Sequence, residues 1–360
     1  MTGKTVTHVN SQTGMLSQRV YAMQNDRRAL WNVSVLAQIY VSLSLYLYGA
    51  VSTAGLWSLG LTVPYMLLIL FLSNRVRPVS GFGCLVFFLL QMFDAQLILY
   101  ALSAMLKEVM PEHPQLLLAL FLAIGMAWAN SGKEETALYS LNRFLQWVIF
   151  ALLFYCVCAS IPYGRGDHFF PLFGRGCESI FKGAVCLWGA VNGCVWPRLM
   201  PNEEQMNSSE KVQENNFHAF LPLAGGALVM GVSVWLMPFY AMERPETLGW
   251  RLLLFTNMTP SIPAWSFQVI SLLMLFFLSL SCHIKSAENS LSLLCGKKLP
   301  SFSTLLLLFL PLLPLVFLSN PQAETALITA SFFRAPVMLG FLFLLYIQKR
   351  RNKRRKDIMA

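Results

Sequence analysis

The sequence predicts an all-α integral membrane protein with about ten transmembrane helices. Of its 360 residues, 56% are hydrophobic and only 12% are charged, whereas a soluble domain of this size carries about a quarter charged residues. Apolar windows of about twenty residues, the length that crosses the hydrocarbon core as a helix, recur along the chain. Both observations favour a single helical bundle in a membrane.

These windows define ten expected spans, of which the fourth and the ninth are short. They lie at residues 31–49, 55–73, 81–106, 115–130, 144–162, 177–197, 217–240, 263–282, 303–318 and 332–348. The sequence therefore divides into an N-terminal segment of residues 1–30, a transmembrane domain of residues 31–348 and a basic tail of residues 349–360.

The distribution of positive charge predicts the orientation of these spans. Twenty of the 27 Lys and Arg residues fall in the N-terminal segment, in the loops after even-numbered spans and in the tail. The opposite side, span ends included, holds Lys107, Arg165, Arg175, Lys182, Arg244, Arg251 and Arg334. Because cytoplasmic loops are enriched in Lys and Arg, we expect both termini in the cytoplasm. Topology and attraction to anionic lipid then explain the net charge of +10, without a nucleic-acid partner.

Signatures of soluble enzymes and of metal sites are missing from the sequence. It contains no phosphate-binding glycine loop, no GxSxG and no HExxH, and none of its eight cysteines has CxxC spacing. The five histidines are expected in the N-terminal segment, in loops or near span ends. We therefore expect neither an enzyme nor a cofactor or metal.

Asp94 is the one acidic residue near the centre of an expected span. A carboxylate at this depth costs several kcal/mol and faces the bundle interior. It could hold a proton, pair with a ligand amine, or serve packing alone. Gln91 and Gln96 flank it, without sharing its helical face squarely. We expect Asp94→Asn to abolish ligand response while leaving membrane levels intact.

The sixth span combines charge near one end with small and polar residues near its centre. Glu178 and Lys182, four residues apart, can pair on one helical face, and we expect a structural pair. Gly189 and Gly193 share a face with Asn192 beside them. This pattern is typical either of close helix packing or of a helix broken at mid-depth, whose exposed backbone groups bind a polar solute.

Hydroxyl groups mark the first span. Ser42 and Tyr46 are four residues apart and share a face, with Ser44 between them. Such hydroxyls can bind a solute, but in membrane helices they often bond back to their own backbone. Both interpretations stay open at this point.

Several short motifs resemble the spore germination permease family, the B subunits of Ger-type germinant receptors. In HFFPLFGRGCESIFKGAV (168–185), Pro171, Gly176, Lys182 and Gly183 match a family pattern in the loop and the first turns of span six. AGLWSLG (54–60), LKEVM (106–110) and the segment after EETALYSLNRF resemble family elements as well. The chain departs from the family where Ala190 replaces a glutamate, and where the first span lacks a mid-span glycine and proline.

The resemblance implies the fold of the amino acid–polyamine–organocation transporters, two inverted repeats of five helices in which spans one and six are discontinuous (LeuT-like). It also implies a receptor subunit in the spore inner membrane that binds an amino acid or similar nutrient beside A and C subunits. The expected ligand-binding residues are Ser42, Ser44, Tyr46, Asp94, Gly189, Asn192 and Gly193. The alternatives are a proton-coupled amino acid transporter of the same fold and a structural subunit whose pocket is vestigial.

Overall fold

The computed structural model describes most of the expected spans. The described residues are 31–45, 53–76, 81–109, 164–174, 176–199, 219–236, 262–296 and 320–359, with isolated positions between 147 and 162 and at 307. The expected span 115–130 lies outside them, as do nearly all of spans 144–162 and 303–318.

Every secondary-structure element in the described residues is helical, as predicted. Four helices are long and apolar enough to cross a membrane, which identifies a multi-pass membrane protein. They are α2 (Thr53–Ser73), α3 (Phe82–Val109), α10 (Ile262–Cys295) and α13 (Asn320–Met359). Shorter apolar helices are the first helix, Trp31–Leu45, and α8 (Leu221–Leu236).

Two of these helices extend well beyond the predicted windows. α10 continues past residue 282 to Cys295, and α13 begins at Asn320 and runs on into the basic tail as far as Met359. The windows were short because they follow hydrophobicity, whereas these extensions carry more polar and charged residues along a continuous helix. The difference moves two residues, His283 and Arg334, from expected span ends into helix interiors.

The sixth span changes its helical type near its centre. It runs as α6 (Cys177–Ala190), then as the 3-10 helix η3 (Val191–Val195), then as α7 (Trp196–Leu199). A stretch of 3-10 helix inside a longer helix often marks a functional or strained position. The first helix, by contrast, is α-helical throughout its described residues.

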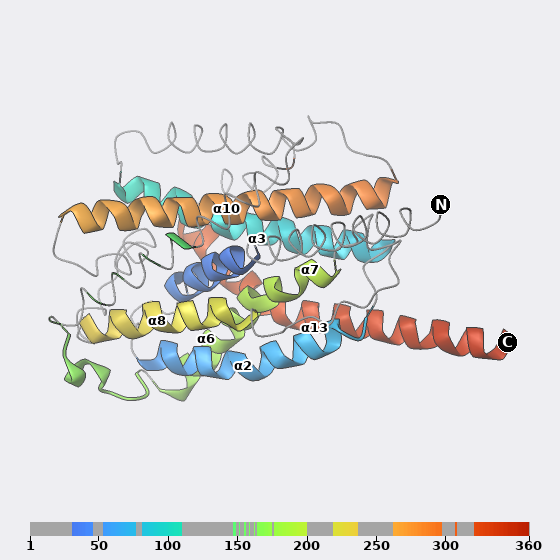
Figure 1. The fold of residues 1–360 in the computed structure, drawn as a ribbon, viewed down its shortest axis with the longest axis horizontal. Helices are drawn as coiled ribbons and strands as arrows, with labels where there is room; N and C mark the ends of the chain where they lie inside the picture. Colours follow the sequence, from blue (N-terminus) through green and yellow to red (C-terminus); the bar gives the residue numbers. More distant parts are fainter. Residues whose placement is uncertain are drawn as a thin grey trace, which may run out of the picture.

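The helices pack around the first helix, which lies between two groups in Figure 1. On one side α10 runs along α3, and on the other α2 contacts α6 and α8 while α13 contacts α6. One apolar core extends through these contacts, with Ile39, Leu97, Trp196 and Phe276 among its buried members.

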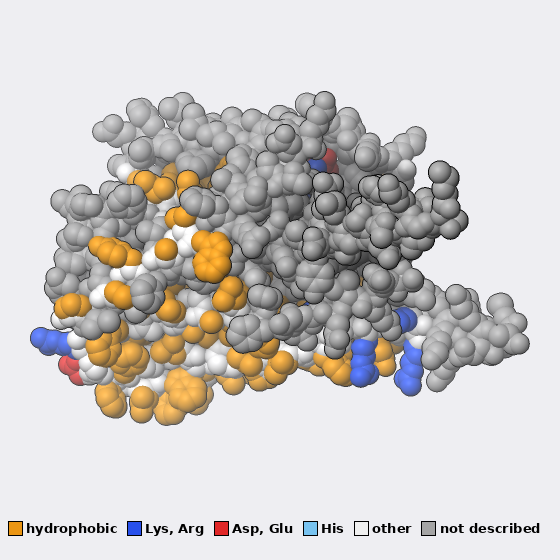
Figure 2. All heavy atoms as spheres, viewed as in Figure 1, with side chains coloured by type: hydrophobic (Ala, Val, Ile, Leu, Met, Phe, Trp, Pro, Cys, Tyr) orange, Lys and Arg blue, Asp and Glu red, His pale blue; other side chains and the backbone are white. Residues whose placement is uncertain are grey.

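α2 shows how the sequence distinguishes core from lipid. Ala54, Ser58, Tyr65 and Ile69 are buried on one face, and the Ser58 hydroxyl donates to the carbonyl of Ile180 on α6 at 2.8 Å. The opposite face exposes large hydrophobic side chains, namely Trp57, Leu61, Leu68 and Phe71. Figure 2 shows hydrophobic side chains gathered along the edge of the molecule where α2 runs. This exposed face suits contact with lipid.

Cations that the charge distribution predicted on one side of the membrane meet at one end of the bundle. Arg198 Nη1 donates to Asn74 Oδ1 at 2.8 Å, and Lys349 Nζ donates to the Arg75 carbonyl at 2.8 Å. These donors satisfy acceptors where α2 ends, where the helix dipole favours positive charge. The ends of spans two, six and ten that were expected on one side therefore do lie together.

Candidate functional site

A buried ion pair lies at the centre of the helix bundle. Asp94 of α3 and Arg334 of α13 are each about 97% buried, and Arg334 Nη2 donates to the Asp94 carboxylate. The helical rise places Arg334 about 22 Å from Lys349 along α13, so the pair lies well away from the basic tail. Asp94 thus faces the bundle interior, as expected, and its partner is Arg334, which the sequence placed near a span end.

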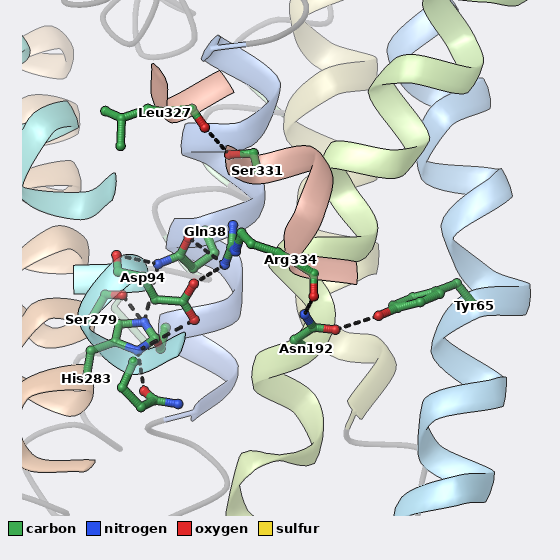
Figure 3. A network of polar contacts seen from close by, with 11 residues as sticks. Gln38, Tyr65, Asp94, Asn192, Ser279, His283, Leu327, Ser331 and Arg334 are labelled. Atoms are coloured by element: carbon green, nitrogen blue, oxygen red, sulfur yellow. Dashed lines mark hydrogen bonds and ion pairs between the residues drawn. The ribbon is translucent and has the colours of Figure 1, made fainter. Parts of the chain in front are cut away.

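Gln38 of the first helix forms hydrogen bonds to both residues of the ion pair. The Gln38 amide accepts from Arg334 Nη2 at 3.2 Å and donates to the Asp94 carbonyl at 3.0 Å. Figure 3 shows Gln38, Asp94 and the Arg334 guanidinium converging from three helices. The fully buried amide therefore links the first helix to both α3 and α13.

His283 of α10 extends this network and is buried beside Asp94. Its Nε2 lies 2.9 Å from the Ser34 hydroxyl and 3.3 Å from Gln38 Nε2, and its Nδ1 lies 2.7 Å from Gln91 Oε1. Gln38 Nε2 can only donate, so His283 Nε2 must accept. The neutral imidazole with its proton on Nδ1 therefore satisfies all these contacts. The 3.9 Å contact between His283 Nδ1 and Asp94 Oδ2 is then polar rather than ionic.

Some donors in this region have no partner. Arg334 Nη1 and Gln91 Nε2 are buried, and neither donates a hydrogen bond in the described structure. Both atoms are N–H donors, so what is lacking is a hydrogen-bond acceptor. Buried polar groups are rarely left in this state, and a bound acceptor would satisfy them.

Asn192, in the 3-10 segment of span six, connects α2 to α13. It accepts from the Tyr65 hydroxyl at 2.7 Å and donates to the Arg334 carbonyl at 3.3 Å. The Tyr65 ring stacks on Trp188 at 5.2 Å between centroids. Figure 3 shows Arg334 between the Asp94 group and the Asn192–Tyr65 pair. Asn192 therefore holds the backbone of the same residue whose side chain pairs with Asp94.

The two glycines of span six lie in close helix contacts. A Cβ at Gly189 would meet Arg334 Cβ at 2.9 Å, and a Cβ at Gly193 would meet Val35 Cγ2 at 2.5 Å. Gly189 therefore lets α13 approach α6, and Gly193 lets the first helix approach η3. In this conformation side chains cover the glycine face where a solute was expected, which is the geometry of small-residue packing.

Two of the three first-span residues that were expected to bind a ligand, Ser42 and Ser44, are buried in the described part of the first helix. Ser42 is buried one turn beyond Gln38 on the same helical face. The Ser44 hydroxyl donates to the Tyr40 carbonyl at 2.9 Å, which is the back-bonded geometry. Tyr46 lies outside the described residues.

Arg334 and His283 were not among the predicted site residues, and Gln91 was predicted to lie off the helical face of Asp94. Arg334 stood at the edge of the window 332–348, and His283 stood one residue past the window 263–282. One signal does mark His283, because Ser279, His283, Ser286 and Ser290 recur at i, i+4, i+7 and i+11, and all four are buried. Gln91 precedes Asp94 by three residues, which places it on the same face of α3.

Two further expectations concern charged and metal-binding groups. The pairing of Lys182 with Glu178 is confirmed at 2.5 Å, and both side chains are largely exposed. Among the described residues, no group of three His, Cys, Asp or Glu side chains could hold a metal ion.

Comparison with known proteins gives only a distant structural likeness. No protein-family model matches the sequence, and no curated protein does. Solved structures of three mutants of the manganese transporter of Eremococcus coleocola align at 15% identity with a TM-score of 0.49. They cover 90% of this chain and 76–77% of their own. At this level of similarity no residue role is carried over from them.

Proposed function

We propose that this chain is the permease-like subunit of a spore germinant receptor. It is a non-enzymatic protein of the spore inner membrane that binds a small nutrient, with amino acids as the leading class, and acts beside A and C subunits. The motif resemblance in residues 54–60, 106–110 and 168–185 supports the receptor role. The buried polar network supports the solute-binding role.

The observation that carries the binding role is the Asp94–Arg334 pair with its unpaired donors. Charges are costly inside a membrane protein and mark pathways or binding sites there. Stability alone explains the pair poorly, because well-packed hydrophobic residues often replace a buried ion pair without loss of stability. Here Gln38, Gln91 and His283 surround the pair, from three separate helices. Such a set recognises a polar solute better than it holds helices together.

A proton-coupled transporter of the same fold is the second candidate. The observation in its favour is that Asp94 Oδ2 lies 3.9 Å from His283 Nδ1, because an acid and a base exchange a proton once they come within hydrogen-bond reach or are bridged by one water. Uptake of labelled amino acids into proteoliposomes, driven by an imposed pH gradient, separates transport from sensing. A sensing subunit binds the solute without accumulating it.

The binding role is tested with the purified full chain in detergent and a panel of the common amino acids. At least one amino acid should raise the unfolding temperature in a saturable way, whereas sugars and inorganic salts should not. Spores that lack the chain should also fail to germinate in response to the same amino acid. If no amino acid stabilises the protein and the deletion spores respond normally to every nutrient, the proposal is wrong, and the vestigial subunit is favoured.

A further inference from the structure

The guanidinium of Arg334 is hydrogen-bonded on one edge, whereas its other edge is buried without a hydrogen-bond partner in the described structure. Its Nη2 donates to both Asp94 and Gln38, while the buried Nη1 donates to no described group. Figure 3 shows one edge of the guanidinium turned toward these partners and the other turned away from them. The side chain is also held sterically, because it packs on the Gly189 position and its Cζ lies 5.7 Å from the Phe93 ring centroid.

A charged donor that is fixed in position and has an unpaired N–H is a binding site for a hydrogen-bond acceptor. A buried N–H of a charged group that lacks a partner costs more than a neutral one, and the guanidinium edge matches the planar, bidentate geometry of a carboxylate, as it does that of a phosphate. Rotation of Arg334 toward another acceptor would break its bonds to Asp94 and Gln38. The acceptor must therefore come to the Nη1 edge.

The net charge of the buried site restricts the kind of carboxylate ligand that it can bind. The negative charge of Asp94 already balances that of Arg334, and the contacts of His283 require its neutral form. A simple carboxylate would leave one uncompensated negative charge in the membrane interior, which is strongly unfavourable. A zwitterion adds a carboxylate for Arg334 and brings its own positive charge, which can approach the Asp94 side of the pair. The net charge then stays at zero.

We propose that Arg334 is the carboxylate anchor of this protein, and that its ligand is a zwitterionic amino acid bound with the Asp94–Arg334 pair intact. This inference rests on the proposed binding function and specifies it. It assigns the binding of the ligand's carboxylate to a side chain of α13, whereas the sequence had suggested backbone groups of span six as the solute-binding groups. The glycines of span six then serve as the surface against which Arg334 is positioned.

The first test uses the wild-type chain and chemical variants of the amino acid that stabilises it best in the panel. Its amide and its decarboxylated amine lack the carboxylate, and the matching deaminated acid lacks the ammonium. We expect all three to bind at least about tenfold more weakly than the parent, because each loses a charged contact or adds unbalanced charge. If the amide binds as well as the parent, Arg334 does not anchor a carboxylate, and a buried water on Nη1 is the explanation.

The second test changes the anchor. Arg334→Lys keeps a positive charge for Asp94 but is shorter and has no second planar edge, so the protein should fold and bind the parent at least about tenfold more weakly. The double variant Asp94→Asn/Arg334→Gln removes both buried charges together and should lose discrimination between parent and amide. Arg75→Gln, a cation at the end of α2 outside the network, is the control and should bind normally.

The outcomes separate this inference from the proposed function. If no amino acid stabilises the wild type, both are wrong. If the parent stabilises the wild type and Arg334→Lys equally, and the amide does so too, amino-acid binding stands and the Arg334 anchor is rejected. If the variants fold poorly, the ligand series on the wild type still decides, since it needs no substitution.

Discussion

Replacing Asp94 with asparagine removes the one acidic partner that the described residues provide for Arg334. Asparagine keeps the size and one acceptor oxygen of the aspartate but leaves the arginine charge uncompensated inside the bundle. Both side chains are only 3% exposed, so water can solvate the uncompensated arginine charge very little. Removing one partner of such a buried pair costs about 3–5 kcal/mol. We therefore expect a clear loss of stability and a lower membrane level, in contrast to the sequence-based expectation that levels stay intact.

A double-mutant cycle tests this reasoning. Asp94→Asn, Arg334→Gln and the double variant are unfolded reversibly in mixed micelles, and the free energy of unfolding is compared with the wild type. The double variant carries neither charge of the pair, so it should be more stable than either single variant, with a coupling energy of at least about 2 kcal/mol. If the two single effects simply add, the side chains do not act as a buried pair, and the site described above is wrong.

Two further substitutions probe how span six holds Arg334. Gly189→Ala places a methyl group 2.9 Å from Arg334 Cβ and should lower the free energy of unfolding by about 1–3 kcal/mol. The control is Gly340→Ala, whose added methyl group has nothing within 4 Å and should leave the stability unchanged or slightly raised. Equal effects of the two substitutions would contradict the close approach of α6 and α13. Tyr65→Phe leaves Asn192 Oδ1 without its 2.7 Å donor and should lower the free energy of unfolding by about 1–2 kcal/mol in the same assay. An unchanged stability would show that this hydrogen bond does not contribute to the site.

The class of this protein follows from its sequence. Spans of about twenty apolar residues with few charges can only be membrane helices, because backbone groups in lipid must be satisfied within the segment. The burial of Asp94 follows from the same cost, which forces a mid-span carboxylate away from lipid. The Glu178–Lys182 pair was also predictable, since residues four apart on a helix are neighbours whatever the rest of the chain does.

The site itself was decided by contacts between distant parts of the chain. Asp94 and Arg334 are 240 residues apart, and hydrophobicity windows contain no information about which helices pack together. The same windows ended beside His283 and Arg334 and so assigned both to helix ends. The role of Gly189 likewise depends on its neighbour, because a small residue in a membrane helix can expose backbone to a solute or admit another helix. Only the packing of α13 against α6 selects the second possibility, and that packing places the arginine beside the aspartate.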